Sequence, residues 1–297
     1  MPELDVAELV EAVTRRVLAQ LGSDGALATR VDQAYDPTRP LVAANWKMNA
    51  CAEGLAPYLA ELVAADPAVD VLLFPPAVLI AAVADGVTRA GRPDLGVGSQ
   101  DLHWEPGGAH TGEHSGALIR AAGGSWTLVG HSERRLAGET DDQIRRKLRA
   151  GLNADLAVML CVGESLEARR TGATFRVLRN QLQAALGDSA LQPPAPHRLA
   201  VAYEPVWAIG TGEVATLEQI QEAAAFVRQV VTELFDFQRA RDIRVLYGGS
   251  VKPENAGEIL SAPDVGGLLV GGASLKGASF CAIVDASAPV DATRRRP

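Results

Sequence analysis

The sequence has few of the features that mark exported, membrane-embedded or redox proteins. Only three of its 297 residues are cysteine, and Cys51, Cys161 and Cys281 have neither metal-site nor redox-pair spacing. An odd number of cysteines without a signal peptide is typical of the reducing cytoplasm. No apolar run reaches the roughly 18 residues that a membrane-spanning helix needs. We therefore expect a soluble cytoplasmic protein with no membrane partner and no metal site.

Concentrated positive charge is also absent. The chain carries 28 lysine and arginine residues against 36 acidic ones, which gives a formal net charge of −8. No stretch is basic enough to follow a phosphate backbone, so nucleic acid is not an expected partner. An anionic substrate must then be attracted by a few local positive groups, because the overall field repels it.

Short apolar runs alternate with stretches of helical spacing after position 40. Eight such runs occur, at Leu41–Ala44, Val69–Phe74, Leu95–Val97, Trp126–Val129, Leu156–Leu160, Leu199–Ala202, Ile243–Leu246 and Gly267–Val270. Helical spacing is clearest in Asp141–Leu152, Thr174–Leu186 and Leu217–Phe235. Strands that are apolar on both faces and alternate with helices indicate parallel β/α units. Eight units in residues 41–297 predict an α/β fold, a single closed (β/α)8 TIM barrel.

An open, doubly wound sheet would give the same alternation of strands and helices. In that fold the first strand is followed by a glycine-rich fingerprint for dinucleotides. Here the first run leads into Asn45-Trp46-Lys47-Met48-Asn49. The sequence therefore favours the closed barrel.

The predicted strand ends carry a usable acid–base set. In a parallel barrel, the side chains that act on substrate lie at the C-terminal ends of the strands. These positions hold Lys47 after the first strand, His131 after the fourth and Glu204 after the sixth. A fixed cation, an imidazole and a carboxylate at one mouth suit proton-transfer chemistry.

Glycine clusters follow the last two strands. Gly248-Gly249-Ser250 follows the seventh and Gly271-Gly272 the eighth. Small residues let backbone N–H groups approach an anion, and a following helix adds partial positive charge. A single Gly-Gly pair is explained by a tight turn. Two clusters on consecutive strands, one of them with a serine, favour a phosphate site instead.

Together these segments resemble the motifs of the triosephosphate isomerase family. The similar motifs occur in the family's order, at Asn45–Asn49, Gly130–Arg135, Cys161–Glu164, Tyr203–Gly212 and Tyr247–Val251. The resemblance implies an isomerase that interconverts D-glyceraldehyde 3-phosphate and dihydroxyacetone phosphate through an enediolate, within glycolysis and gluconeogenesis. It implies no metal and no cofactor, because the substrate's own carbonyl makes the migrating proton acidic.

The resemblance also assigns roles to single residues. Glu204 would be the general base. His131 would be a neutral electrophile at the start of a short helix, a role for which this family is a standard example. Lys47 would supply fixed positive charge, Asn45 a neutral donor, and Glu133 would pair with Lys47 and assist proton transfer.

Substrate binding and a closing segment follow from the same resemblance. The phosphate would be held by backbone N–H groups near four residues, namely Gly210, Ser250, Gly271 and Gly272. Trp207 and Ile209 would belong to an apolar lid that ends at Gly212 and excludes water. Glu213 stands where many relatives carry lysine, which affects the expected lid kinetics but not the chemistry. Cys161 is expected to be a packed residue and not a nucleophile.

The resemblance further implies a homodimer. Pro106–Ser115 looks like the family's third loop, which reaches into the partner subunit, and Gln100 matches an interface residue. Less usual residues surround this loop, namely His103, Trp104, His110 and His114.

Residues 1–40 are absent from ordinary members of the family. Residues 1–22 show an amphipathic helical pattern, and residues 23–40 read as a polar linker. Three interpretations remain open for this extension: a peptide that directs the enzyme into the lumen of a bacterial microcompartment through its shell, a helix that packs on the barrel or dimer, and a poorly ordered tail. Two other functions also remain, isomerisation of a four-carbon ketose phosphate such as erythrulose phosphate and a non-catalytic scaffold or cargo role.

Overall fold

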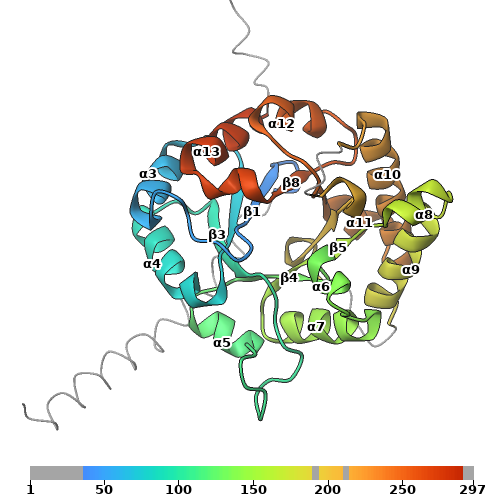
Figure 1. Cartoon of the computed structure of the whole chain (residues 1–297), viewed down its shortest axis with the longest axis horizontal. Helices are drawn as coiled ribbons and strands as arrows, with labels where there is room; N and C mark the ends of the chain where they lie inside the picture. Colours follow the sequence, from blue (N-terminus) through green and yellow to red (C-terminus); the bar gives the residue numbers. More distant parts are fainter. Residues whose placement is uncertain (1–35, 189–193, 210–213, 290–297) are drawn as a thin grey trace, which may run out of the picture. The chain divides into compact units, whose positions relative to one another are not determined.

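The computed structural model describes residues 36–188, 194–209 and 214–289 (Figure 1). The helix predicted for residues 1–22, most of the predicted linker, and Gly210 to Glu213 lie outside these ranges. No helix in the described ranges is long and apolar enough to cross a membrane.

Eight parallel strands form a closed barrel in which neighbours in sequence are neighbours in space. The strands are β1 (Leu41–Asn45), β2 (Asp70–Phe74), β3 (Leu95–Ser99), β4 (Trp126–Val129), β5 (Ala157–Val162), β6 (Leu199–Tyr203), β7 (Arg244–Tyr247) and β8 (Gly267–Val270). Leu41 pairs with Asp70 on one side and with Gly267 on the other, which joins β1 to β2 and closes the barrel to β8. The predicted (β/α)8 barrel is confirmed.

Several strands run beyond the apolar segments that predicted them. β3 continues to Ser99, which pairs with Thr127 of β4, and β1 continues to Asn45, which pairs with Phe74. Ladder hydrogen bonds join backbone groups and do not require an apolar side chain, so hydrophobic runs mark the strand centres better than their ends.

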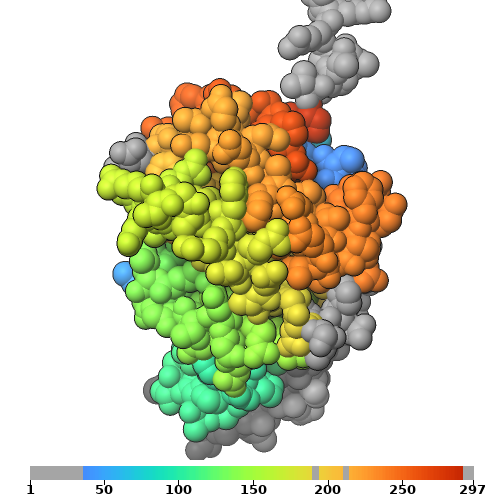
Figure 2. Space-filling view, turned by 90° about the vertical axis from the view of Figure 1, so that its right-hand side faces the viewer, coloured from blue at the N-terminus to red at the C-terminus, as the bar shows by residue number. Residues whose placement is uncertain are grey.

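Helices surround the barrel on the outside. They are α3 (Leu55–Ala64), α4 (Ile80–Ala90), α5 (Gly116–Ala121), α6 (Ser132–Leu136), α7 (Asp141–Asn153), α8 (Leu166–Arg170), α9 (Thr174–Leu186), α10 (Leu217–Leu234), α11 (Phe237–Asp242), α12 (Pro253–Leu260) and α13 (Gly277–Ala286). Short 3-10 turns are η1 (Ala77–Leu79), η2 (Pro196–Arg198), η3 (Val206–Ala208) and η4 (Gly272–Leu275). In the space-filling view of Figure 2, the part of the chain coloured from green through yellow to orange covers most of the face turned to the viewer. The three helices predicted from spacing are confirmed as α7, α9 and α10.

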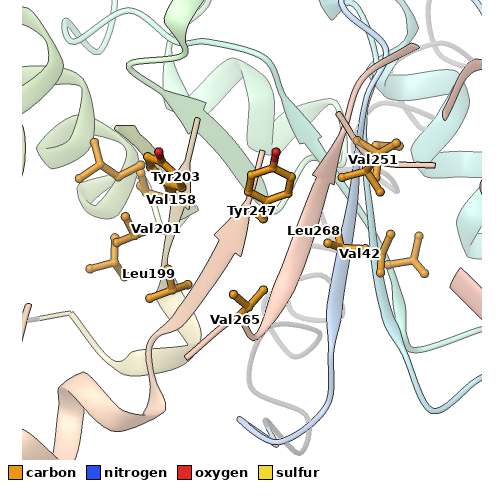
Figure 3. Close-up of a cluster of buried hydrophobic side chains, with 14 of the residues drawn as sticks. Val42, Val158, Leu199, Val201, Tyr203, Tyr247, Val251, Val265 and Leu268 are labelled. Carbon is orange, nitrogen blue, oxygen red and sulfur yellow. The ribbon is translucent and has the colours of Figure 1, made fainter. Parts of the chain in front are cut away.

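Two hydrophobic clusters arise from the alternation of side chains along each strand. Leu41 and Ala43 of β1 belong to the cluster that fills the barrel, whereas Val42 and Ala44 belong to the cluster that includes the helices. Figure 3 shows part of this outer cluster, including Val201 on β6. Both faces of the strands are therefore buried, which explains why the sequence shows continuous apolar runs.

Candidate active site

A cavity of about 320 Å³ lies at the C-terminal ends of the strands. Its lining includes seven residues that the sequence predicted for the site: Asn45, Lys47, His131, Glu204, Ser250, Gly271 and Gly272. Glu133 joins this group through Lys47, and Gly210 lies outside the described residues. The fold thus brings together residues that are separated by up to 227 positions in the sequence.

Glu204 follows β6 and is almost completely buried, with 2% of its surface exposed. Its Oε2 accepts a hydrogen bond of 2.9 Å from the backbone N–H of Ser132, the first residue of α6. Its Oε1 lies 3.2 Å from Nε2 of His131. One carboxylate oxygen is therefore held by a helix start and the other faces the imidazole.

Two glycines give the Glu204 segment its room. A Cβ on Gly163 would lie 1.7 Å from the carbonyl oxygen of Glu204, and a Cβ on Gly248 would lie 3.0 Å from its Cγ. A side chain directly after β5 would therefore displace the backbone of Glu204, and one directly after β7 would press on its side chain.

His131 caps the N-terminus of α6, as the sequence predicted. Its Nδ1 accepts a hydrogen bond of 3.2 Å from the backbone N–H of Glu133. A nitrogen that accepts this bond carries no proton, so the imidazole is neutral and its proton resides on Nε2, the atom that faces Glu204.

Lys47 is held in an unusual backbone conformation, with φ at +51°. Its backbone N–H donates to Oδ1 of Asn45 at 3.0 Å, and its carbonyl accepts from Nε2 of Gln100 at 2.7 Å. Gln100 also donates to the carbonyl of Phe74 at 2.9 Å. A left-handed lysine persists only where its surroundings fix it, and these contacts fix it on both sides.

The ammonium of Lys47 pairs with Oε1 of Glu133 at 2.7 Å, as expected. Partial burial of the Glu133 carboxyl opposes its ionisation, but the hydrogen bond and charge of Lys47 outweigh that effect and lower the pKa. This ion pair links the loop after β1 to α6.

The two glycine clusters differ in how they meet the following helix. After β8, η4 begins at once with Gly272, whereas α12 begins only at Pro253, after a five-residue loop. A helix thus follows each glycine cluster, directly after β8 and beyond a short loop after β7.

The loop after β7 is fixed by residues that the sequence did not single out. Oδ1 of Asn255 accepts from the backbone N–H of Lys252 at 2.8 Å, and its Nδ2 donates to the carbonyl of Ser250 at 3.1 Å. Asn255 is the third residue of α12, a position where an amide side chain often bonds back to the residue before the helix. This capping pattern could have identified Asn255 from the sequence. The hydroxyl of Ser250 donates to the carbonyl of Ala208 at 3.0 Å.

A buried carboxyl lies beside the strand that carries Glu204. Oε1 of Glu164 accepts from Nε1 of Trp207 at 2.9 Å and from the hydroxyl of Tyr203 at 3.2 Å. Burial raises the pKa of the Glu164 carboxyl, against the hydrogen bonds that lower it. Trp207 is thus anchored at the end of β5. Ile209 lines the cavity, and because residues 210–213 are not described, the lid stays a prediction.

Cys161 is completely buried inside the barrel, in agreement with its expected packing role. Burial, reinforced by the charge of nearby Glu204, raises the pKa of its thiol. A protonated thiol is a poor nucleophile, so the site offers acid–base chemistry and not covalent catalysis by Cys161.

Comparison with known proteins agrees with this geometry. A family model described as triosephosphate isomerase matches residues 40–287. The triosephosphate isomerase of Citrifermentans bemidjiense is 44% identical over 250 residues, covering 83% of this chain and 98% of that protein. That of Moorella thermoacetica is 45% identical over 251 residues, with the same coverage.

A solved structure of a triosephosphate isomerase is also similar to this chain. The crystal structure of triosephosphate isomerase from Bartonella henselae superimposes with a TM-score of 0.74 at 37% identity, covering 84% of this chain and 98% of that one. The chain belongs to the triosephosphate isomerase family. It is therefore an isomerase, and every residue of the triosephosphate isomerase motifs described above lies within the matched range. Residues 1–39 precede that range.

Proposed function

We propose that this chain interconverts D-glyceraldehyde 3-phosphate and dihydroxyacetone phosphate by moving a proton between adjacent carbons through an enediolate. One observation carries the proposal: a buried carboxylate, a neutral imidazole and an ammonium line a single cavity in a member of this family. The proposal requires no metal or cofactor, because each step uses a side chain or the substrate's own carbonyl.

Glu204 is the proposed base. It removes a proton from one substrate carbon and returns it to the neighbouring carbon, so the carboxylate is regenerated in each turnover. Its burial supports this role, since bulk water is kept away from the carboxylate where the proton is transferred. The backbone N–H of Ser132 holds Oε2 at 2.9 Å, so the carboxylate is already positioned before substrate arrives.

His131, Lys47 and Asn45 are the proposed electrophilic groups. The Nε2 proton of His131 polarises the substrate carbonyl and moves between its two oxygens as the enediolate forms and collapses. Lys47 stabilises the negative charge that develops, and Asn45 adds a neutral donor. Glu133 positions the Lys47 ammonium through their ion pair and assists the proton transfers.

The substrate phosphate is proposed to lie between the two glycine turns. Gly271 and Gly272 have no side chain to block an anion, and the first N–H groups of η4 have no partner within that turn. Ser250 lines the same cavity, and Gly210 is proposed to contribute from the lid. A phosphate held here would leave the carbon end of the substrate near Glu204.

Turnover by wild type and Glu204→Asp tests the proposed base. Shortening the side chain withdraws the carboxylate by about one methylene, so we expect kcat to fall about 100-fold with little change in KM. Glu222→Asp, on the exposed face of α10, is the matched control and should retain full activity. Equal activity of Glu204→Asp and wild type would show that Glu204 is not the base.

The same assay separates the proposed substrate from the four-carbon alternative. Triose phosphates and erythrulose phosphate are compared at equal concentration, and we expect a clear preference for the triose in kcat/KM. The relatives reported above are named for triose phosphate, and no observation favours the longer ketose. A higher kcat/KM for erythrulose phosphate would reverse the assignment, and no turnover of either would favour a scaffold role.

A cytoplasmic homodimer is proposed as the working form. Met48, after β1, is 94% exposed, and Val78, after β2, is 88% exposed. The next strand, β3, leads into the loop 106–115, which projects beyond the ring of helices in Figure 1. Exposed apolar side chains and a projecting loop on three adjacent β/α units suit contact with a second copy.

Residues 1–22 are proposed as a targeting helix and residues 23–40 as its linker, ahead of an isomerase domain at 41–297. Support comes from the apolar stripe in the sequence and from the family match, which begins at residue 40. Residues 1–40 fused to a fluorescent protein should form puncta that coincide with shells in a host with a microcompartment. Diffuse fluorescence would reject targeting, leaving a helix that packs on the barrel or dimer and a poorly ordered tail.

A further inference from the structure

Lysine is rare in this chain, and two of its lysines line the same cavity. Of the 28 basic residues only four are lysine, namely Lys47, Lys147, Lys252 and Lys276, and the other 24 are arginine. Lys47 and Lys252 both line the 320 Å³ cavity. Lys47 has a proposed role in the chemistry, whereas the proposed reaction does not use Lys252.

The backbone of Lys252 is fixed at the rim beside the proposed phosphate site. The carboxamide of Asn255 accepts from the N–H of Lys252 at 2.8 Å and donates to the carbonyl of Ser250 at 3.1 Å. One side chain therefore fixes Lys252 relative to Ser250. The Lys252 side chain is exposed, so its ammonium stays hydrated although the backbone that carries it is held in place.

The charges around the cavity leave an anionic substrate poorly attracted without Lys252. Lys47 is neutralised by Glu133 at 2.7 Å, Glu204 adds a negative charge, and His131 is neutral. Lys252 makes no ion pair with any carboxylate in the described ranges. Since the whole chain carries a net charge of −8, its long-range field repels a phosphate dianion.

We propose that Lys252 is a substrate-attracting residue, whose ammonium draws the phosphate end of the substrate to the rim and strengthens its binding. The inference rests on the proposed function and extends it. Lysine suits this task because its ammonium is a compact, hydrated point charge. It does not form the paired hydrogen bonds by which arginine binds phosphate, so the product can dissociate. The ammonium favours substrate and transition state equally, so it lowers KM without raising kcat.

The dependence of kcat/KM on ionic strength tests the proposal. For Lys252→Gln we expect kcat/KM to fall about three- to ten-fold near 10 mM salt, with kcat unchanged. The difference from wild type should nearly vanish near 0.5 M salt, where the Debye length is only a few ångströms. Lys252→Arg should keep most of the salt dependence, since it keeps the charge.

Arg89→Gln is the matched control. It removes one positive charge at the C-terminal end of α4, next to the N-terminal end of β3 and hence at the end of the barrel opposite the cavity. The expected result is a salt dependence equal to that of wild type. An equal loss in Arg89→Gln would overturn the proposal, because net charge would then explain the effect without Lys252. The proposal would also be overturned if kcat/KM of Lys252→Gln and of wild type depended on salt in the same way.

Binding of inorganic phosphate, measured by calorimetry at low salt, separates this inference from the proposed function. Phosphate should bind about three- to ten-fold more weakly to Lys252→Gln than to wild type or Arg89→Gln. This result would support the role of Lys252 even if wild type did not turn over triose phosphate, an outcome that would refute the proposed function alone. Equal phosphate affinity in all three proteins would refute the role of Lys252.

Discussion

At the scale of single residues, Lys47 shows how a catalytic geometry depends on partners from elsewhere in the chain. Its position after the first strand could be read from the sequence, but its φ of +51° could not. That conformation is maintained by Gln100, which is 53 residues away and follows β3. The family resemblance marked Gln100 as an interface residue, and the structure gives it a second contact, within the same chain, to the backbone of Lys47.

Gln100→Ala is predicted to impair the reaction more than the fold. Loss of the amide donor frees the Lys47 carbonyl, so the backbone can relax and the ammonium moves away from the developing charge. We expect kcat/KM to fall about ten-fold and the free energy of unfolding to fall by about 1 kcal/mol. Steady-state kinetics and denaturant titration measure the two effects. Gln229→Ala, at an exposed position on α10, is the control, and equal kinetics in the two variants would contradict the prediction.

At the scale of elements, the sequence predicts what local interactions decide. α7 and α10 begin one residue after Thr140 and Thr216, and each threonine forms a capping box with a glutamine three residues later. Such signals lie within a few positions, so the predicted starts at Asp141 and Leu217 agree with the structure. The contact between the ends of β5 and β6 through Glu164 joins residues about 40 positions apart and had no local signal.

Glu164→Gln is predicted to change how stability depends on pH. Burial raises the pKa of Glu164 in the folded state, so its contribution is complete below the unfolded value of 4.5 and is lost as pH rises through the folded pKa. Glutamine resembles the neutral acid at every pH. The stability of wild type relative to Glu164→Gln should therefore decrease between about pH 4 and pH 7, by about 1.4 kcal/mol for each unit of raised pKa.

Denaturant unfolding at several pH values measures this difference. Glu167→Gln on α8 is the control, because it makes the same substitution at an exposed carboxyl. A stability difference for Glu164→Gln that does not change with pH would show that burial does not favour the neutral acid at this position.

At the scale of the whole molecule, the exposed apolar residues on the first three β/α units remain to be covered. Met48 is the most exposed of the large hydrophobic side chains in the described ranges, at 94%. A monomer rarely places such residues beside a projecting loop without a partner. The predicted dimer would cover them, and it would also enclose the loop after β1 that carries Lys47.

Met48→Glu is predicted to dissociate the dimer. A carboxylate buried at an interface without a counter-charge is costly, so the dissociation constant should rise at least about 100-fold. Analytical ultracentrifugation should give twice the chain mass of 31.2 kDa for wild type and the single mass for the variant. Phe237→Glu, at an exposed position on α11, should remain dimeric. A monomeric wild type, or a dimeric Met48→Glu, would contradict the proposed interface.

The sequence by itself determined the eight β/α units, the identity of the residues at the strand ends and the glycine turns. These follow from hydrophobic periodicity and from residue types that act over a few positions, which are local properties. Only the tertiary structure decided that Gln100 holds Lys47, that Asn255 fixes Ser250 and Lys252, and that Lys252 shares a cavity with Glu204. These contacts form only when the barrel closes and brings distant strand ends together. Hydrophobic periodicity reports on neighbouring residues, so it cannot reveal a contact between residues far apart in the sequence.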